Sequence, residues 1–230
     1  MFLSFRILFL SATMQRIFGL QRLASFALHK SVDLHLHIAR GSVVDFSCRQ
    51  HGAIVNAANE VCLGGGGVDG AITSAGGKTL AVDRQNLPVL SGGIRCPTGS
   101  AVLTGPGQYG SLHVPYVIHA VGPNYNQYDD FEKPDELLRS AYQTSLDLCR
   151  DSEDIEEVAF ALLSAGIFRG KREKNDVLKI GIGGIRDWVS GAVVDDNANV
   201  GLLKGVTMYG FSDQETDLLL DICKGELEAK

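Results

Sequence analysis

Apolar positions along this chain recur in two patterns, one typical of strands and one typical of helices. Residues 32–38 alternate apolar and polar side chains, which predicts the first strand of a sheet, at its edge. Apolar runs of strand length predict further strands at 53–55, 100–104, 116–121, 158–163 and 202–211. Helical spacing predicts helices over 69–79, 134–150, 176–189 and 213–228. Strands that alternate with helices predict an α/β fold, a three-layer α/β/α sandwich around a mixed central sheet.

The richest stretch follows the strand at 53–55, which ends abruptly in Asn56, Ala57, Ala58 and Asn59. Ligands of open α/β sheets bind at the carboxyl ends of the strands. The four consecutive glycines of 64–67 then leave backbone amides open to a phosphate, and the helix that follows adds partial positive charge. A bare glycine run is also typical of a flexible linker, but this one joins an apolar strand to an alanine-rich helix. We therefore predict a phosphate-binding loop.

A second loop of the same kind follows the apolar run at 158–163. It reads Ser164, Ala165, Gly166, Ile167 and Phe168, small residues whose amides can approach a phosphate and an aromatic ring that can pack against a ribose. A core aromatic is the alternative interpretation of the ring. Basic residues at 169–172 follow, and we expect them to contact the diphosphate of a ligand or a modified protein.

These motifs carry a resemblance to a known family. The sequence NAAN followed by LGGGGVDGAI resembles the first ligand loop of macrodomains, in particular the MacroD-type branch, which binds ADP-ribose and removes it from proteins. Matching motifs follow in the same order at 95–99, 117–123 and 164–168, so the resemblance spans roughly residues 32–223. It implies a hydrolase that removes mono-ADP-ribose from acidic protein side chains, with O-acetyl-ADP-ribose as a further substrate for deacetylation. The alternative is a reader module that binds ADP-ribose without turnover.

The resemblance also assigns roles to residues. It implies that Asn59 and Asp69 bind and orient the distal ribose, which makes them the candidate catalytic residues. A carboxylate at the lip of a phosphate loop can act as a general base or position a water, and Asp69 can also cap its helix. The predicted ligand-binding residues are Ser42, Val43, Asn56, Ala57, Gly65, Gly66, Gly67, Val68, Ser164, Ala165, Gly166, Ile167 and Phe168.

Two positions depart from the family pattern. The family normally carries an aspartate, which accepts a hydrogen bond from the adenine amino group, where this chain has Ser42. A serine lacks the charge that makes such a bond roughly twice as strong, so we expect weaker adenine selectivity. The family also commonly carries a histidine one helical turn after the aspartate, where this chain has Thr73. We expect this change to slow the reaction without abolishing it.

The charge of the chain bears on its partners. The net charge is −6, but residues 1–31 hold four basic residues and no acidic ones, which leaves 17 basic against 27 acidic residues and a charge of −10 over 32–230. An acidic body disfavours non-specific nucleic-acid binding, while backbone amides can still bind an anionic nucleotide. We expect a monomer that binds ADP-ribose and mono-ADP-ribosylated proteins, with no nucleic-acid or membrane partner and no cofactor.

Residues 1–31 lack acids, mix arginine and serine with apolar residues, and contain no apolar run long enough to span a bilayer. We predict a transit peptide for the mitochondrial matrix, followed by a single macrodomain over 32–230. A secretory signal is the main alternative, and translation from Met14 is another. Without a transit peptide, the expected location is cytoplasmic or nuclear.

The five cysteines are scattered, odd in number and without a CxxC pair, which predicts reduced thiols. Cys62 lies in the glycine loop, where a small buried hydrophobic residue is the favoured interpretation and a reactive thiol the alternative. His35 and His37 share one face of a strand without a third ligand. We interpret them as edge or surface residues and predict no metal site.

Overall fold

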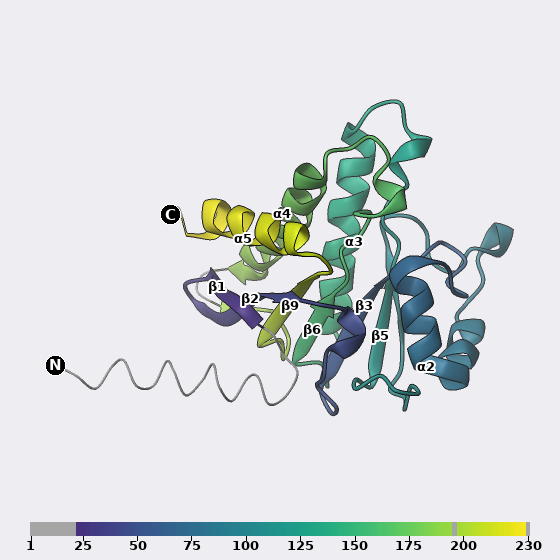
Figure 1. Cartoon of the computed structure of the whole chain (residues 1–230). Helices are drawn as coiled ribbons and strands as arrows, with labels where there is room; N and C mark the ends of the chain where they lie inside the picture. Colours follow the sequence, from purple (N-terminus) through teal and green to yellow (C-terminus); the bar gives the residue numbers. More distant parts are fainter. Residues whose placement is uncertain (1–21, 195–196, 229–230) are drawn as a thin grey trace.

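The computed structural model describes residues 22–194 and 197–228, which form a three-layer α/β/α sandwich (Figure 1). Its mixed sheet has seven strands in the order β1-β2-β9-β6-β3-β5-β4. The strands are β1 (Arg22–His29), β2 (Val32–Arg40), β3 (Gly52–Ala57), β4 (Ala101–Thr104), β5 (Tyr116–Ala120), β6 (Glu157–Phe160) and β9 (Gly205–Gly210). The two edge strands, β1 and β4, pair antiparallel to their neighbours, and the other pairs are parallel. The predicted fold class is confirmed.

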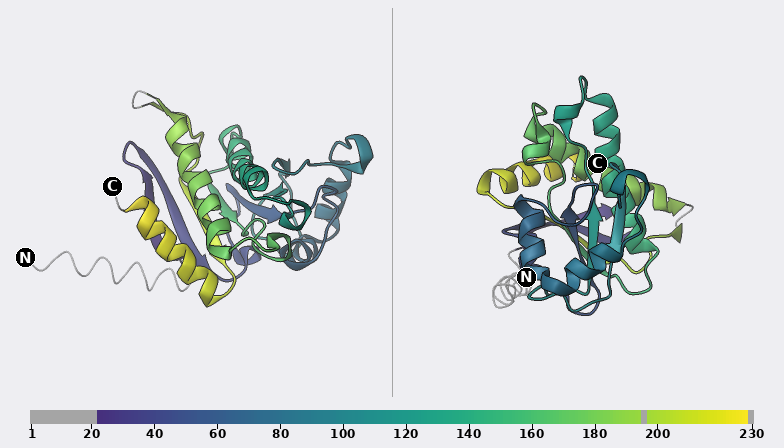
Figure 2. Two further views of the ribbon diagram at one scale, coloured as in Figure 1. Left: turned by 90° about the horizontal axis from the view of Figure 1, so that it is seen from above. Right: turned by 90° about the vertical axis from the view of Figure 1, so that its right-hand side faces the viewer.

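Helices cover both faces of the sheet. The helices are α2 (Gly67–Asn86), α3 (Glu132–Arg150), α4 (Lys174–Ala192) and α5 (Asp213–Leu227), and a small hairpin of β7 (Val193–Val194) and β8 (Asn197–Ala198) follows α4. Helices α3, α4 and α5 share one face, and α4 and α5 lie along the end that carries β1 and β2 (Figure 2). Helix α2 and the 3-10 helix η1 (Val43–Asp45) pack on the other face. None of the helices in this described part is long and apolar enough to cross a membrane.

Strand β3 shows how the two cores are built. Its residues are buried as a continuous apolar run predicts, and successive side chains point to opposite faces. Ala53 and Val55 join the core under α3, α4 and α5, whereas Ile54 joins the core with Ile72 and Leu80 of α2. Burial on both faces is what a parallel strand between two helical layers requires.

Parallel pairing sets the place of the site. Strands β2, β9, β6 and β3 are adjacent and parallel, so their carboxyl ends lie at one edge of the sheet. The loops that follow these four strands therefore meet there, which is where ligands of open α/β sheets bind. The glycine loop follows β3, and the loop at 164–168 comes shortly after β6.

Residues 32–38 form a strand, as predicted, but they belong to β2, and the prediction that this strand is the first and lies at an edge was wrong. Residues Arg22–His29 form the edge strand β1, which pairs with β2, and Arg22 makes an ion pair with Glu157 of β6 at 3.2 Å. The domain boundary that the sequence predicted before Val32 therefore falls inside the hairpin of β1 and β2. His37 lies on an inner strand and is buried, and its pKa falls to about 4 because burial disfavours the charged ring and Arg22 adds positive charge nearby. The predicted transit peptide otherwise lies in residues 1–21, outside the described residues.

The position of β1 generates a stability prediction. Leu28 is buried in the main core, whereas Leu23 on the same strand is 46% exposed. Leu28→Ala should lower the free energy of unfolding by about 2–4 kcal/mol, because it leaves a cavity in a packed core. The matched change Leu23→Ala should cost less than about 0.5 kcal/mol, as surface substitutions usually do. Urea unfolding of both variants measures the difference, and equal small losses would show that the domain does not depend on β1.

Candidate active site

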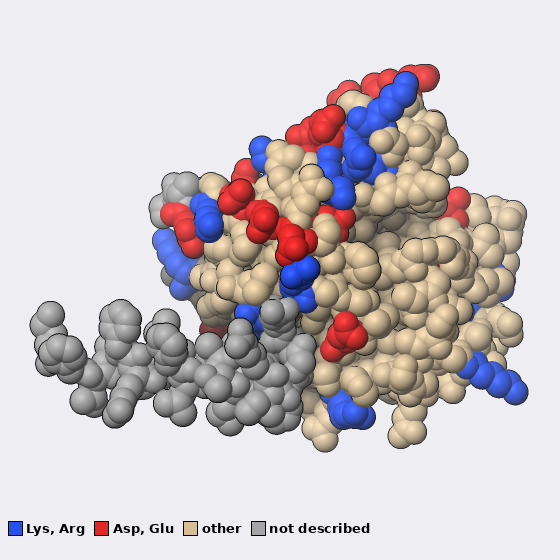
Figure 3. Space-filling model, in the orientation of Figure 1, with Lys and Arg blue, Asp and Glu red and all other residues tan. Residues whose placement is uncertain are grey.

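A two-part cleft opens at the edge of the sheet where the parallel strands end. Its two hollows have volumes of about 430 and 500 Å³. They share a middle wall that comes from the start of α2 and from the loop after β6: Gly67, Val68, Leu162, Ala165 and Gly166. No lysine or arginine of residues 22–194 and 197–228 lines either hollow. Charged side chains gather over α3, α4 and α5, whereas the surface over α2 is mostly uncharged (Figure 3).

The glycine loop supplies one side of this middle wall. A Cβ added at Gly66 or Gly67 would meet no atom within 4 Å, so both backbones face open space. Gly67 has φ of 59°, a conformation that L side chains rarely adopt. Gly66 is the N-cap of α2 and offers no side-chain cap, which leaves the amides of the first helical turn without a side-chain partner. Such amides, at the positive end of a helix, form a site for an anion.

The loop at 164–168 supplies the opposite side. Ser164 takes φ of 51° and donates its hydroxyl to the carbonyl of Pro123 at 2.8 Å, so its side chain is already engaged. Gly166 leaves open space where a side chain would stand. Ile167 begins the 3-10 helix η4 (Ile167–Arg169), and Phe168 lines the larger hollow rather than the core. The loop therefore presents backbone and an aromatic ring to a ligand.

The basic residues after this loop do not line the cleft. Arg172 pairs with Asp135 at 2.9 Å and with Asp176 at 2.6 Å, and its guanidinium lies 4.8 Å from the centre of the Phe131 ring. Arg169 donates to the carbonyl of Arg172. These contacts fasten the loop to α3 and α4. The position of this segment does not support its expected contact with a ligand diphosphate, while its expected contact with a modified protein stays a prediction.

Asn59 shapes the glycine loop. Its Nδ2 donates to the carbonyl of Gly64 at 3.0 Å, and its Oδ1 accepts from the amides of Val61 and Cys62 at 3.1 and 3.2 Å. Asn59 also lines the larger hollow. Its first task is therefore to hold the loop in the shape that faces the ligand. Cys62 is buried, as expected for a small hydrophobic residue, and all five cysteines are free.

Asp69 has hydrogen-bond partners at one carboxylate oxygen and none at the other. Its side chain is only 4% exposed, and its Oδ1 accepts from Nδ2 of Asn56 and from Nη2 of Arg84, both at 2.9 Å. Its Oδ2 has no hydrogen-bond partner, and the residue lines the larger hollow. A Cβ added at Gly65 would lie 2.9 Å from this Oδ2 and 3.2 Å from Nδ2 of Asn59. One acceptor and one donor thus converge beside Gly65 at the floor of the hollow.

Of the sequence-predicted site residues, all but Asn56 line the cleft. Asn56 is fully buried beneath it, where it bonds Asp69 and lies 3.3 Å from Nδ1 of His119. Strand alternation turns this side chain away from the cleft, whereas the chain bends after Ala57 and brings Asn59 to it. Thr73 does not line the cleft either. It donates to the carbonyl of Asp69 at 2.7 Å and accepts from Arg84 at 2.7 Å.

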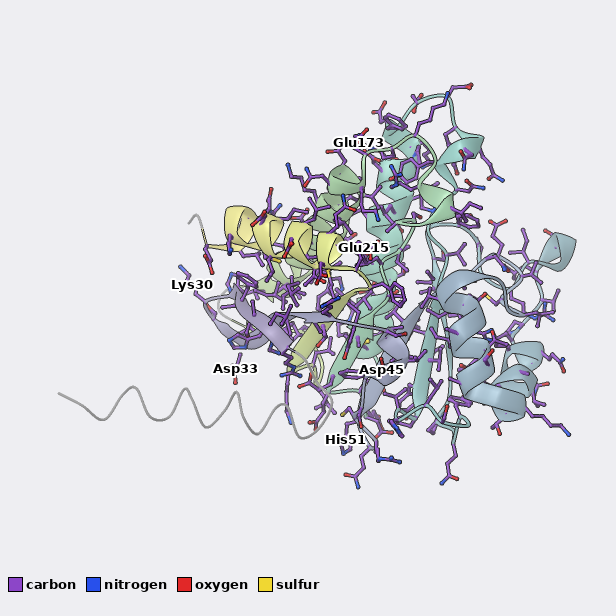
Figure 4. All side chains as sticks on the ribbon, in the orientation of Figure 1. Lys30, Asp33, Asp45, His51, Glu173 and Glu215 are labelled. Atoms are coloured by element: carbon purple, nitrogen blue, oxygen red, sulfur yellow. The ribbon has the colours of Figure 1, made fainter. Side chains whose placement is uncertain are left out.

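Several lining residues were not predicted. Phe211 follows β9 at the smaller hollow and is 77% exposed, and the rule that ligands bind where strands end could have found it. Tyr209 and Glu215 line the same hollow. Figure 4 shows Glu215 at the start of α5, where its carboxylate accepts from Lys174 at 2.7 Å and from the amide of Phe211 at 3.0 Å. No local sequence pattern identifies Arg84 as a site residue, because its contact with Asp69 depends on where α2 bends.

No group of three metal-ligating side chains occurs within residues 22–194 and 197–228. His119, the buried histidine below Asp69, faces Thr104 at 3.1 Å through Nε2 and Asn56 through Nδ1. Burial, and then the charge of Arg84, lower the pKa of His119 to about 3. The ring is therefore neutral near pH 7 and works as a hydrogen-bonding strut.

Comparisons with known proteins show the family of this chain. The model of the macro domain family matches residues 55–178, more than half of the chain. A macro domain-containing protein of Caldanaerobacter subterraneus is 38% identical over 80% of this chain and 92% of its own length. An O-acetyl-ADP-ribose deacetylase of Pantoea vagans is 36% identical over 74% of this chain and 89% of its own. The chain belongs to the macro domain family, as the sequence motifs implied.

Solved structures share the fold. The Oceanobacillus iheyensis macrodomain with ADP superposes with a TM-score of 0.71 and 29% identity, covering 90% of this chain and 98% of that one. The Trypanosoma brucei macrodomain in complex with ADP-ribose has a TM-score of 0.64 and 27% identity, covering 86% of this chain and 73% of that one. Both likenesses extend over nearly the whole of this domain.

The buried histidines predict how stability depends on pH. The pKa values of His119 and His37 lie near 3 and 4 in the folded chain, below the ordinary value of 6.5. Protonation therefore favours the unfolded chain, so this part of the stability is complete above pH 6.5 and is lost as the pH falls below it. As the pH falls below 6.5, each histidine should lower the free energy of unfolding by about 1.4 kcal/mol per pH unit. The loss amounts to about 2 kcal/mol per histidine at pH 5.

Urea unfolding at pH 7 and pH 5 checks this prediction. His119→Gln should make the loss between the two pH values smaller by about 2 kcal/mol, because glutamine does not titrate. His113→Gln, at a partly exposed position, is the matched control for a histidine-to-glutamine change. The same pH dependence in wild type and His119→Gln would contradict the prediction.

Proposed function

We propose that this macrodomain binds ADP-ribose along the two-part cleft. The diphosphate lies between the glycine loop and the loop at 164–168, adenine occupies the hollow beside Phe211, and the distal ribose occupies the hollow beside Asp69. Two hollows joined by a middle wall of backbone amides suit a ligand with two sugars and a central diphosphate. The names of the Trypanosoma and Pantoea proteins support the same ligand.

The reaction that this site supports best is hydrolysis of an ester on the distal ribose. Water adds across the ester bond, which leaves a carboxylic acid on the protein and a free hydroxyl on ADP-ribose. O-acetyl-ADP-ribose contains the same kind of bond, so one site serves both substrates. The observation that carries the proposal is the Oδ2 of Asp69, a buried acceptor without a hydrogen-bond partner in a residue that lines the larger hollow.

Asp69 acts here by positioning. Its Oδ1 already accepts hydrogen bonds from Asn56 and Arg84, which fix the orientation of the carboxylate. Its Oδ2 accepts a hydrogen bond from the attacking water or from a ribose hydroxyl and fixes it beside the ester. Effective positioning of this kind contributes several kcal/mol to catalysis. A reader module without turnover is the second candidate, favoured by Thr73 at the position where the resembling family carries a histidine.

Two substitutions separate turnover from binding. Asp69→Asn should lower the single-turnover rate of ADP-ribose release from automodified protein by about a hundredfold or more, the size of effect expected when one group that stabilises a transition state is lost. Its affinity for ADP-ribose should change less than about tenfold, since an interaction made in the transition state does not weaken ground-state binding. Gly66→Glu should abolish both, because its carboxylate would occupy the anion site.

Calorimetry with ADP-ribose and thermal unfolding complete this test. Gly66→Glu should fold normally, since its Cβ meets no atom within 4 Å. Gly191 lies on α4 and is equally open, so Gly191→Glu is the control that should keep both binding and turnover. Wild-type protein that binds ADP-ribose and releases none from modified protein would favour the reader module. Unchanged turnover in Asp69→Asn would contradict the role of Asp69.

Adenine selectivity is a separate prediction. Ser42 lines the smaller hollow, where its hydroxyl accepts from the amide of Val44 at 3.4 Å. A neutral hydrogen bond to the adenine amino group contributes about 0.5–1.5 kcal/mol, so ADP-ribose should bind no more than about tenfold more tightly than its inosine analogue. Ser42→Asp should increase this preference about fivefold, because an aspartate accepts a charge-assisted bond and still caps η1.

Titration calorimetry with both ligands measures the preference. Ser42→Ala is the matched control and should bind the two ligands about equally. A strong adenine preference that survives in Ser42→Ala would assign recognition to Glu215, the carboxylate that lines this hollow.

A further inference from the structure

Arg84 lies directly behind the carboxylate that faces the larger hollow. Its side chain is 1% exposed, its Nη2 lies 2.9 Å from Oδ1 of Asp69, and its Nη1 donates to Thr73 at 2.7 Å. A Cβ added at Gly64 would lie 3.2 Å from the Thr73 hydroxyl and 3.7 Å from Nη1 of Arg84. The guanidinium therefore supports both the glycine loop and the first turn of α2.

A bend in α2 makes this contact possible. Asp69 and Arg84 are 15 residues apart, a separation of about 22 Å along a straight helix. Gly77 interrupts the helix with φ of 61° and ψ of −154°, a conformation open essentially to glycine. The second half of α2 turns back at this point and carries Arg84 to the first turn. Burial of Leu80 and Arg84 holds the returning half against the domain.

The contact decides the charge of the site. A carboxylate as buried as Asp69 stays ionised only with compensation, because an unpaired buried charge costs several kcal/mol. Besides Arg84, the titratable groups that face this pair are His119 from β5 and Cys62 from the glycine loop. His119 is neutral near pH 7, and a thiol carries no positive charge. Arg84 is thus the one compensating cation among the described neighbours of Asp69.

We propose that Arg84 is a positioning residue of the site: it keeps Asp69 ionised, occupies Oδ1, and so leaves Oδ2 as the acceptor aimed at the distal ribose. Together with Thr73 it fills the space behind the glycine loop at the position where the resembling family carries a histidine. Arg84 does not line the cleft, so it acts through Asp69 and not on the substrate. The inference about turnover rests on the proposed function, while the inference about the charge of Asp69 does not.

The test compares Arg84→Met, which removes the charge and keeps most of the volume, with Arg84→Lys, which keeps the charge. Carbon-13 NMR of protein labelled at aspartate carboxyls follows Asp69 directly, and its signal is assigned by its absence in Asp69→Asn. We expect the Asp69 signal to titrate at least one pH unit higher in Arg84→Met than in wild type and Arg84→Lys. Equal titration midpoints in all three proteins would overturn the proposal.

Kinetics test the consequence for turnover. In Arg84→Met the carboxylate becomes protonated as the pH falls, so the rate of ADP-ribose release relative to the wild type should fall as the pH is lowered from 8.5 to 5 and recover as it is raised again. Arg84→Lys should keep the wild-type pH profile. Arg139→Met, which breaks an ion pair with Asp187 between residues that do not line the cleft, is the matched control and should also keep it. A loss in Arg84→Met of the same size at every pH would assign Arg84 a packing role and overturn the proposal.

Failure of the proposed hydrolase function and failure of the proposed role of Arg84 give different results. A wild-type protein without turnover would end the hydrolase assignment, while the NMR titration would still decide the role of Arg84. If Arg84→Met does not fold, the variant Asp69→Asn/Arg84→Met removes both charges. Recovery of the wild-type melting temperature in this double variant supports the buried charge pair, and a double variant as unstable as the single one overturns it.

Discussion

The parallel pairing of four neighbouring strands is the constraint on which the rest of this structure depends. Residues of β2, β9, β6 and β3 lie in continuous parallel register, and burial on both faces leaves the strand ends as the place where polar groups can gather. The loops that follow these strands then have to meet along one edge. The cleft is the direct consequence, because most of its walls are those loops and the start of α2.

The electrostatics of the cleft are local. The chain is acidic, and no lysine or arginine in the described part of the chain lines either hollow, yet the middle wall is suited to an anion. Backbone amides and the positive end of α2 account for this, since they carry fixed partial charges that do not depend on net charge. The arginines near the cleft serve other tasks: Arg172 fastens a loop to α3, and Arg84 supports Asp69 from behind.

A buried polar layer lies between the glycine loop and the sheet. Asn56, Asp69, Arg84 and His119 are each almost completely buried and are joined by hydrogen bonds and an ion pair. Such groups are costly to bury unless they satisfy one another. Their arrangement gives the carboxylate a fixed orientation, which a surface residue on a mobile loop would not have.

The sequence by itself determined the strand and helix order, the two ligand loops and most of the residues that line the cleft, because these depend on local patterns: apolar runs, glycines and the residues that follow them. It did not determine β1, since residues 22–29 become a strand only by pairing with β2. Nor did the sequence show that Asn59 lines the cleft and Asn56 does not. Strand alternation buries Asn56, and the bend after Ala57 brings Asn59 to the cleft. Arg84 reaches Asp69 only through the bend at Gly77. Contacts between residues distant along the chain form only in the folded structure, and so only the tertiary structure decided them.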